Sequence, residues 1–171
     1  MEINCLPSLT DTNTHTIILG TIPGVESLNA KEYYANVDNI FWDIVFRTFP
    51  PIIKCDELVM DMDLTYKDKT SRLLSHGFGM WDTIKTCTRE SGSSDRKLKD
   101  VELNDFDDFF EINPQIEFIM FNGIKAEDYF KRKYKSLYKK IGHQLMSSTS
   151  GQNPTNPFLV LKQWKEIYLS R

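Results

Sequence analysis

The chain has 171 residues, of which 40% are hydrophobic and 26% charged, with a formal net charge of −3 and a pI near 5.6. These values predict one globular domain over residues 1–171 and argue against a protein that coats nucleic acid by positive charge alone. The sequence contains neither an apolar stretch of about 20 residues nor a cleavable leader pattern. We therefore expect a cytoplasmic monomer without a membrane segment, associated with the nucleoid when it acts on DNA.

The first predicted strand covers residues 16–20, a short β-branched run that ends in a turn rich in glycine and proline. Such a turn directs backbone N–H groups outward at the carboxyl end of a strand and suits an anion such as phosphate. It is also an ordinary strand-to-loop connection. A polar loop with two adjacent tyrosines follows, and the apolar spacing over residues 39–49 predicts a buried helix that stops at Pro50.

The rest of the chain alternates between helices and strands. We expect a helix over 67–76, a strand over 80–84, a polar loop over 85–96, an acidic helix with Phe106, Phe109, Phe110 and Ile112 inward, a strand over 116–121, a helix over 125–138, a strand over 141–146 and a helix over 157–169. This alternation predicts an α/β fold, a three-layer α/β/α sandwich around a mainly parallel four-stranded sheet. The four strand-following loops then meet at one sheet edge and can line one cleft.

The cysteines and the runs of charged residues are weaker indicators of function. The three cysteines, Cys5, Cys55 and Cys87, are far apart, which indicates a reduced protein with structural thiols and no zinc site. Residues 100–111 are acidic and residues 125–140 are basic. Each run is typical of a solvated helix face, and the basic run is also the best candidate for an edge that faces phosphates.

Four motifs span nearly the whole chain. They are Gly-Thr-Ile-Pro-Gly at 20–24 with Tyr-Tyr-Ala-Asn-Val-Asp-Asn-Ile-Phe-Trp at 33–42; Met-Trp-Asp-Thr-Ile at 80–84 with Cys87, Arg89 and Gly-Ser-Ser-Asp at 92–95; Phe-Asn-Gly-Ile-Lys-Ala at 121–126; and Ser-Ser-Thr-Ser-Gly-Gln-Asn at 147–153. In this order they resemble the uracil-DNA glycosylase superfamily, most closely its hypoxanthine-DNA glycosylase (deoxyinosine glycosylase) branch. The resemblance implies a monofunctional DNA glycosylase that removes a flipped-out deaminated base, hypoxanthine above all, in base excision repair.

The resemblance also implies residue roles. Ile22 stands where mismatch-specific uracil glycosylases have a water-orienting Asn, so the catalytic position is that of the hypoxanthine branch, Asn39. Tyr34 matches the ring that stacks on the extruded base. The remaining base-binding residues are Gly20, Thr21, Ile22 and Pro23, and the DNA-binding residues are Ser148, Thr149, Ser150, Ser93 and Ser94. The late loop at 148–150 is implied to help fill the vacated stack. Neither metal nor organic cofactor is expected, and the partner is damaged DNA.

Two departures from the family pattern affect these expectations. The usual Leu-Pro-Ser-Thr-Ser-Pro of the late loop reads Met-Ser-Ser-Thr-Ser-Gly at 146–151, and the loss of both prolines predicts a more mobile loop. The usual His-Pro before the catalytic Asn is replaced by Asn36 and Val37. Both changes make an altered substrate range a possibility that the sequence leaves open.

Several side chains also have purely structural interpretations. Asn39 is a good N-cap for a helix that begins at Ile40, a role compatible with catalysis. Asp38 is a candidate base, although adjacent side chains usually diverge. Asp82 and Asp95 are either cap residues or part of the substrate loops, and Asn122, His76 and His143 are expected to be structural. The lysines fall on helix faces, so the sequence does not predict a Schiff-base nucleophile.

Three other functions stay open at this point. The first is a uracil or G:T/U mismatch-specific glycosylase, which uses the same chemistry. The second is a non-catalytic DNA-lesion-binding module that keeps the cleft without turnover. The third is a nucleotide-binding enzyme with a phosphate loop at residues 20–24, although this loop lacks the Gly-Lys-Ser/Thr ending that such loops carry.

Overall fold

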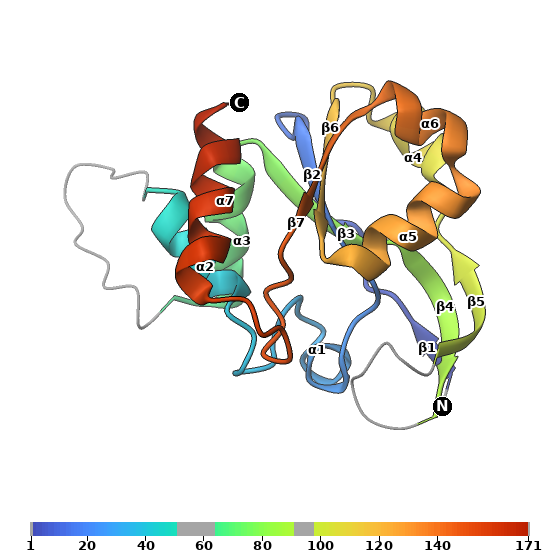
Figure 1. Cartoon of the computed structure of the whole chain (residues 1–171), viewed down its shortest axis with the longest axis horizontal. Coiled ribbons are helices and arrows are strands. Elements are labelled where there is room, and N and C mark those ends of the chain that lie inside the picture. Colours follow the sequence, from blue (N-terminus) through green and yellow to red (C-terminus); the bar gives the residue numbers. More distant parts are fainter. Residues whose placement is uncertain (1, 51–63, 91–97, 171) are drawn as a thin grey trace.

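The structure is a computed structural model that describes residues 2–50, 64–90 and 98–170. Its central sheet contains four parallel strands in the order β3-β2-β6-β7 (Figure 1). These strands are β2 (Thr16–Gly20), β3 (Phe78–Asp82), β6 (Phe118–Asn122) and β7 (Gly142–Met146). Each one overlaps a strand predicted from the sequence, so the four-stranded parallel sheet is confirmed.

Helices cover both faces of this sheet, and the predicted three-layer α/β/α arrangement is confirmed (Figure 1). One layer contains α2 (Phe41–Thr48), α3 (Tyr66–Ser75) and α7 (Pro157–Leu169), and the other contains α4 (Phe106–Ile112), α5 (Ile124–Lys133) and α6 (Lys135–Lys140). Successive strand residues point to opposite faces. In β2, Ile18 therefore joins one apolar core, whereas Ile17 and Leu19 join the other.

Local sequence signals fix the ends of the helices. Thr65 and Asp68 form a capping box at the start of α3, which satisfies N–H groups that the first helical turn leaves without partners. Gly77 follows this helix with a φ of 77°, a conformation that glycine adopts without steric cost. Pro157 begins α7, where a proline loses no helical hydrogen bond.

The helix predicted over residues 125–138 is divided at Tyr134 into α5 and α6. The Tyr134 side chain is buried, and its hydroxyl donates to the Asn104 backbone carbonyl and accepts from the Phe106 backbone N–H. Tertiary hydrogen bonds thus interrupt a segment whose apolar periodicity is continuous. The basic run extends along both helices, and its first member, Lys125, lies in the first turn of α5.

A second sheet was not predicted. It contains β1 (Glu2–Asn4), β4 (Ile84–Arg89) and β5 (Leu98–Leu103), paired antiparallel in the order β1-β4-β5. The polar loop predicted over 85–96 is therefore wrong for residues 85–89. Ile84 and Cys87 are buried, whereas the exposed Lys85 pairs with Glu102 of β5 at 2.8 Å. One face of β4 is polar, so its sequence lacks the continuous apolar run that predicts a buried strand.

Two smaller expectations also change. Ile112, predicted to point inward from α4, is 69% exposed because it lies in the last turn of the helix. The loop after β2 contains a short helix, α1 (Val25–Ala30), which was not expected. In the part of the chain that the structure describes, the helices are too short or too polar to cross a membrane.

Candidate active site

A pocket of about 500 Å³ opens at the carboxyl edge of the central sheet. Gly20, Asp82 and Asn122, the last residues of β2, β3 and β6, contribute to its wall, and Ser148 follows β7. The complete lining is Gly20, Thr21, Ile22, Pro23, Gly24, Glu26, Ser27, Tyr33, Tyr34, Asn36, Asp38, Asn39, Asp82, Asn122, Ser148, Thr149, Ser150, Gly151 and Gln152. The strand-following loops therefore converge as predicted, and nine of the predicted site residues line one pocket.

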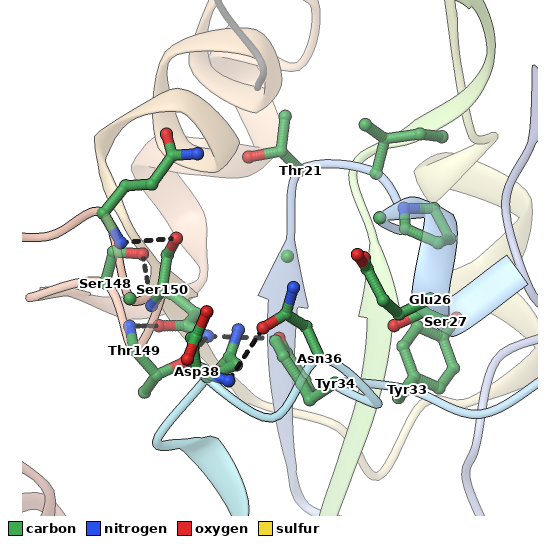
Figure 2. Close-up of a pocket in the computed structure, with 18 of the residues that line it drawn as sticks. Thr21, Glu26, Ser27, Tyr33, Tyr34, Asn36, Asp38, Ser148, Thr149 and Ser150 are labelled. Atoms are coloured by element: carbon green, nitrogen blue, oxygen red, sulfur yellow. Dashed lines mark hydrogen bonds between the residues drawn. The ribbon is translucent and has the colours of Figure 1, made fainter. Parts of the chain in front are cut away.

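The pocket has two opposing sides, which Figure 2 shows. Ser148, Thr149 and Ser150 form one side, and Glu26, Ser27 and Tyr33 form the other, with Tyr34 and Asn36 between them. Ser93, Ser94 and Asp95, which the sequence placed near this edge, lie outside the described residues. Cys55 lies outside them as well.

The turn at 20–24 forms a fixed wall of the pocket. Backbone N–H groups of Thr83 and Ile84 donate to the carbonyls of Gly20 and Thr21 at 2.8 and 3.0 Å. The fully buried Arg89 of β4 donates from Nη1 to the Pro23 carbonyl at 3.0 Å. The second sheet therefore holds this turn in place.

Ile22 and Gly20 have different functions within this wall. The Ile22 side chain is buried and packs with Ile3, Ile84 and Cys87, so the turn offers no side chain that could hold a water at that position. A Cβ atom on Gly20 would lie 2.6 Å from Asp82 Oδ1 and 3.2 Å from the Tyr34 hydroxyl. The absence of a side chain at Gly20 therefore leaves room for both polar groups beside the end of β2.

Tyr34 is held in a strained conformation. Its φ of 57° lies in the left-handed region, which bulky residues rarely adopt and which costs roughly 1–3 kcal/mol. One face of its ring stacks on Phe41, with centroids 3.7 Å apart and planes inclined by 12°, and its hydroxyl accepts from Asn122 Nδ2 at 3.2 Å. Burial, and next the charge of Asp82, raise the pKa of the Tyr34 hydroxyl. Tyr34 therefore presents a neutral, fixed ring to the pocket.

The neighbouring Tyr33 anchors this loop to the core. Its backbone N–H donates to the Tyr66 hydroxyl and its carbonyl accepts from Trp42 Nε1, each at 3.0 Å. Its own hydroxyl donates to the Leu6 carbonyl at 3.0 Å. Burial raises the pKa of Tyr33, and the charge of Asp82 contributes in the same direction. These bonds fix the backbone on one side of Tyr34 and so maintain its unusual conformation.

Asn39 lines the pocket and also caps a helix. Its Oδ1 accepts from the Phe41 backbone N–H at 3.0 Å, at the first residue of α2, while Ile40 occupies the N-cap position. The Asn39 backbone N–H donates to the Asn36 carbonyl at 3.0 Å. The sequence predicted Asn39 as the N-cap of a helix that begins at Ile40; the helix begins one residue later, so Asn39 precedes the N-cap residue but still accepts a hydrogen bond from the first helical N–H. Because a carbonyl oxygen has two lone pairs, this bond orients the amide and leaves it able to accept a second hydrogen bond.

The late loop is tied to Asn122, whose side chain makes three hydrogen bonds to two residues. Asn122 Nδ2 donates to Thr149 Oγ1 at 2.9 Å and to Tyr34, and Asn122 Oδ1 accepts from the Thr149 N–H at 3.0 Å. The Thr149 carbonyl in turn accepts from the Ile40 N–H at 3.0 Å. Asn122 therefore connects the tyrosine loop, the sheet and the late loop.

Thr149 is fully buried, with 0% of its surface exposed, so it anchors the late loop and its side chain does not face the solvent. The predicted DNA contacts remain predictions for Ser148 and Ser150, which are more exposed. The Ser150 N–H donates to Ser148 Oγ at 3.2 Å. Hydrogen bonds within the loop thus replace part of the rigidity that the two missing prolines would have given.

Three acidic side chains also line the pocket. Asp82 is only 4% exposed, whereas Asp38 and Glu26 are exposed at the rim. The sequence left Asp82 undecided between structural and substrate-loop roles, and it assigned Asn122 a structural role. The structure ends β3 at Asp82 and β6 at Asn122, whereas the predicted strands covered 80–84 and 116–121, so the sequence indicated only that both residues lie near the carboxyl ends of parallel strands. Asp38 and Asn39 both line the pocket, so the expected divergence of adjacent side chains does not remove Asp38 from it.

The buried tyrosines predict loss of stability in alkali. An unfolded tyrosine releases its proton near pH 10, but the folded protein retains the protons of Tyr33 and Tyr34 above that pH because their pKa values are raised. The free energy of unfolding should therefore be unaffected by these groups below about pH 9. Above about pH 10 it should fall by up to ~1.4 kcal/mol per pH unit for each such tyrosine. Urea denaturation between pH 8 and 11 measures this slope, and Tyr33→Phe should make it shallower; an equal slope contradicts the assignment.

The chain is similar to known proteins over nearly its whole length. No protein-family model matches the chain. A hypoxanthine DNA glycosylase of Methanosarcina acetivorans is 34% identical over 164 residues, 95% of each chain, and one of Methanosarcina barkeri is 31% identical over 170 residues, 98% of this chain and 99% of the relative. The solution NMR structure of a candidate uracil DNA glycosylase from M. acetivorans superposes with a TM-score of 0.79 and 29% identity, covering 98% of this chain and 97% of the other. This near full-length similarity establishes that the chain belongs to the hypoxanthine-DNA glycosylase branch of the uracil-DNA glycosylase superfamily.

Proposed function

We propose that this protein is a monofunctional DNA glycosylase that hydrolyses the N-glycosidic bond of a flipped-out deaminated base, foremost hypoxanthine, in base excision repair. The observation that carries this proposal is the single pocket in which Tyr34, Asn39 and Asp82 meet. A base can react there only after it leaves the duplex, because its glycosidic carbon is inaccessible within the stack. The pocket volume of about 500 Å³ accommodates a nucleobase and part of its sugar.

Tyr34 supplies the surface on which the base lies. Phe41 covers one face of the Tyr34 ring, and the ring contributes to the pocket wall, so an entering base stacks on the side away from Phe41. Stacking of this kind is worth roughly 1–3 kcal/mol per base. The strained backbone and the bond from Asn122 hold the ring in position before the base arrives, which reduces the entropy lost on binding.

Asp82 provides a means to select deaminated bases. Hypoxanthine carries a ring N–H at N1 and uracil carries one at N3, whereas adenine and cytosine have lone pairs at these positions. A carboxylate accepts hydrogen bonds and donates none. The buried Asp82 carboxylate is therefore compatible with the N–H of hypoxanthine or uracil and repels the lone pair of adenine or cytosine, the bases from which they arise.

Asn39 positions the water that attacks the sugar. The transition state has a positively charged, oxocarbenium-like sugar and a leaving base that carries negative charge. An amide cannot accept the water proton efficiently, so its contribution is alignment, which alone can accelerate a reaction greatly. The helix-capping bond to Phe41 fixes the direction of the Asn39 amide. The adjacent Asp38 adds negative charge at the rim, which favours the positive sugar.

The reaction needs only water and side chains, so we assign no metal or organic cofactor. Lysine, which a lyase reaction through a Schiff base requires, does not occur among the described residues that line the pocket. Ser148 and Ser150 contact the DNA beside the lesion in this proposal, together with Ser93 and Ser94. The proposed protein is a monomer that acts in the cytoplasm, at the nucleoid when bound to DNA.

A panel of duplexes tests the proposed function. Duplexes that carry hypoxanthine, uracil or a G:T mismatch are incubated with the protein, and half of each sample is then treated with alkali to break abasic sites. We expect the fastest alkali-dependent breakage with hypoxanthine and intact strands without alkali. Faster cleavage of uracil would reassign the substrate, breakage without alkali would indicate a lyase, and lesion binding without base release would indicate a binding module.

A further inference from the structure

Val37 is an apolar side chain exposed at the mouth of the pocket. It is 97% exposed, more than any other large hydrophobic residue that the structure describes. Single exposed apolar residues are common on protein surfaces and have no meaning by themselves. The position of Val37 is what distinguishes it, because Asn36 and Asp38 on either side of it both line the pocket.

The loop that carries Val37 is firmly held. The Asp38 N–H donates to Asn36 Oδ1 at 2.8 Å, and the Asn39 N–H donates to the Asn36 carbonyl at 3.0 Å. A Cβ atom on Gly151 would lie 2.7 Å from the Asp38 carbonyl oxygen, so the late loop packs directly against this turn. Val37 thus projects into solvent from a hydrogen-bonded turn against which the late loop packs.

The late loop beside it has no comparable side chain. Residues 147–152 read Ser-Ser-Thr-Ser-Gly-Gln, and the one methyl group among them, that of Thr149, is fully buried. Proteins that unstack a duplex commonly insert an apolar side chain between neighbouring bases. A serine loop can bind phosphates and base edges, but it cannot fill the gap with an apolar group.

We propose that Val37 is the wedge that enters the DNA stack when the damaged base turns into the pocket. This inference rests on the proposed function, since the wedge has a role only if a base is extruded. The partner is duplex DNA with one nucleotide flipped out. In this arrangement Tyr34 receives the base, Ser148 and Ser150 contact the strand, and Val37 occupies the space that the base has left.

The test compares two substrates that differ only in stacking. One is a duplex with a single hypoxanthine, and the other has the same strand with unpaired bases on both sides of the lesion, so that the stack is already open. Under single-turnover conditions, Val37→Ser should lower the rate on the closed duplex on the order of 10-fold or more and on the open bubble by less than about twofold. Val37→Leu should stay within about threefold of the wild type on both, because it restores an apolar wedge.

A second readout follows extrusion without chemistry. In the probe duplex, 2′-fluoro-2′-deoxyinosine, whose fluorine slows cleavage of the glycosidic bond, stands next to 2-aminopurine, which becomes more fluorescent when unstacked. The wild type and Val37→Leu should increase the fluorescence on binding, and Val37→Ser should not. Ile112→Ser is the matched control, because it also replaces an exposed apolar residue by serine. Ile112 precedes the turn at 113–117, which lies at the amino edge of the sheet, where the Glu117 N–H donates to the His15 carbonyl.

Each outcome has a defined meaning. Equal losses on the closed duplex and the open bubble, an unchanged rate on the closed duplex, or the same selective loss in Ile112→Ser would overturn the wedge assignment. If the wild-type protein releases no base from either substrate, the proposed function itself fails. A wild type that is active on both substrates and a Val37→Ser variant that is impaired only on the closed duplex would support both.

Discussion

Asn39→Ala should lower the single-turnover rate of hypoxanthine release at least ~100-fold while the protein stays folded. Loss of one preorganised polar group at a reacting centre commonly costs this much. The same change removes the bond from the Phe41 N–H to Asn39 Oδ1. Loss of a side-chain bond at a helix start costs about 1 kcal/mol, a small part of the ~5–15 kcal/mol that stabilises an ordinary domain. The rate is measured by alkali-dependent strand breakage with enzyme in excess of DNA.

Asn156 provides a matched control for the capping role. Its Oδ1 accepts from the Phe158 N–H at 2.9 Å at the start of α7, the same i to i+2 bond that Asn39 makes. Asn156 does not line the pocket. Asn156→Ala should therefore lose similar stability and keep its rate, whereas Asn39→Ser should keep the cap and lose the rate. A rate for Asn39→Ala within threefold of that of Asn156→Ala would remove Asn39 from catalysis.

Asn122→Ala should impair both stability and activity. The substitution leaves the buried Thr149 N–H without its partner, and an unsatisfied buried group costs roughly 1–3 kcal/mol. It also releases the Tyr34 hydroxyl and the late loop together. We therefore expect a lower urea midpoint and a rate of base release that falls on the order of 10-fold or more, since small displacements of positioning groups have large kinetic effects.

Thr149→Val separates the two parts of this prediction. It removes the acceptor for Asn122 Nδ2 and keeps the backbone bond to Asn122 Oδ1, so its losses of stability and rate should both be smaller. Both variants are assayed at a temperature where circular dichroism finds them folded. If Asn122→Ala is destabilised but releases hypoxanthine at the wild-type rate, Asn122 is a structural residue, as the sequence alone suggested.

Local patterns were sufficient to predict the central sheet and most of its helices. The buried strands at 16–20 and 118–122 are continuous apolar runs between turn residues, the pattern typical of parallel strands that are covered on both faces. The last helix begins at Pro157 and ends at Leu169, as its sequence predicts. The sequence signals that predict each of these elements lie within a few residues of one another.

The second sheet depends on contacts that are distant in sequence. Ile3 pairs with Cys87, and Ile84 pairs with Leu103, so no short window of the chain contains both partners. The exposed face of β4 is polar, and β5 contains the acidic residues Asp100 and Glu102, which read as the start of an acidic helix. Tertiary pairing therefore decides the structure of these segments against their local composition.

The pocket could be predicted in position but not in its internal bonding. The rule that ligands bind at the carboxyl ends of parallel strands located it correctly. The left-handed Tyr34 and the fully buried Thr149 could not be foreseen, because the groups that hold them, on Tyr66 and Asn122, come from segments distant in the sequence. The residue roles at this site remain proposals, and the variants above test them individually.

The most direct measurement is the amount of free hypoxanthine that the wild-type protein releases from a duplex with one deoxyinosine. Chromatography with mass detection quantifies the base, and alkali treatment of the same samples quantifies abasic sites. We predict equal molar amounts of both products over time, with almost none from Asn39→Ala. Hypoxanthine that stays in the strand, or that the wild type and Asn39→Ala release equally fast, would contradict a base-excision pocket centred on Asn39.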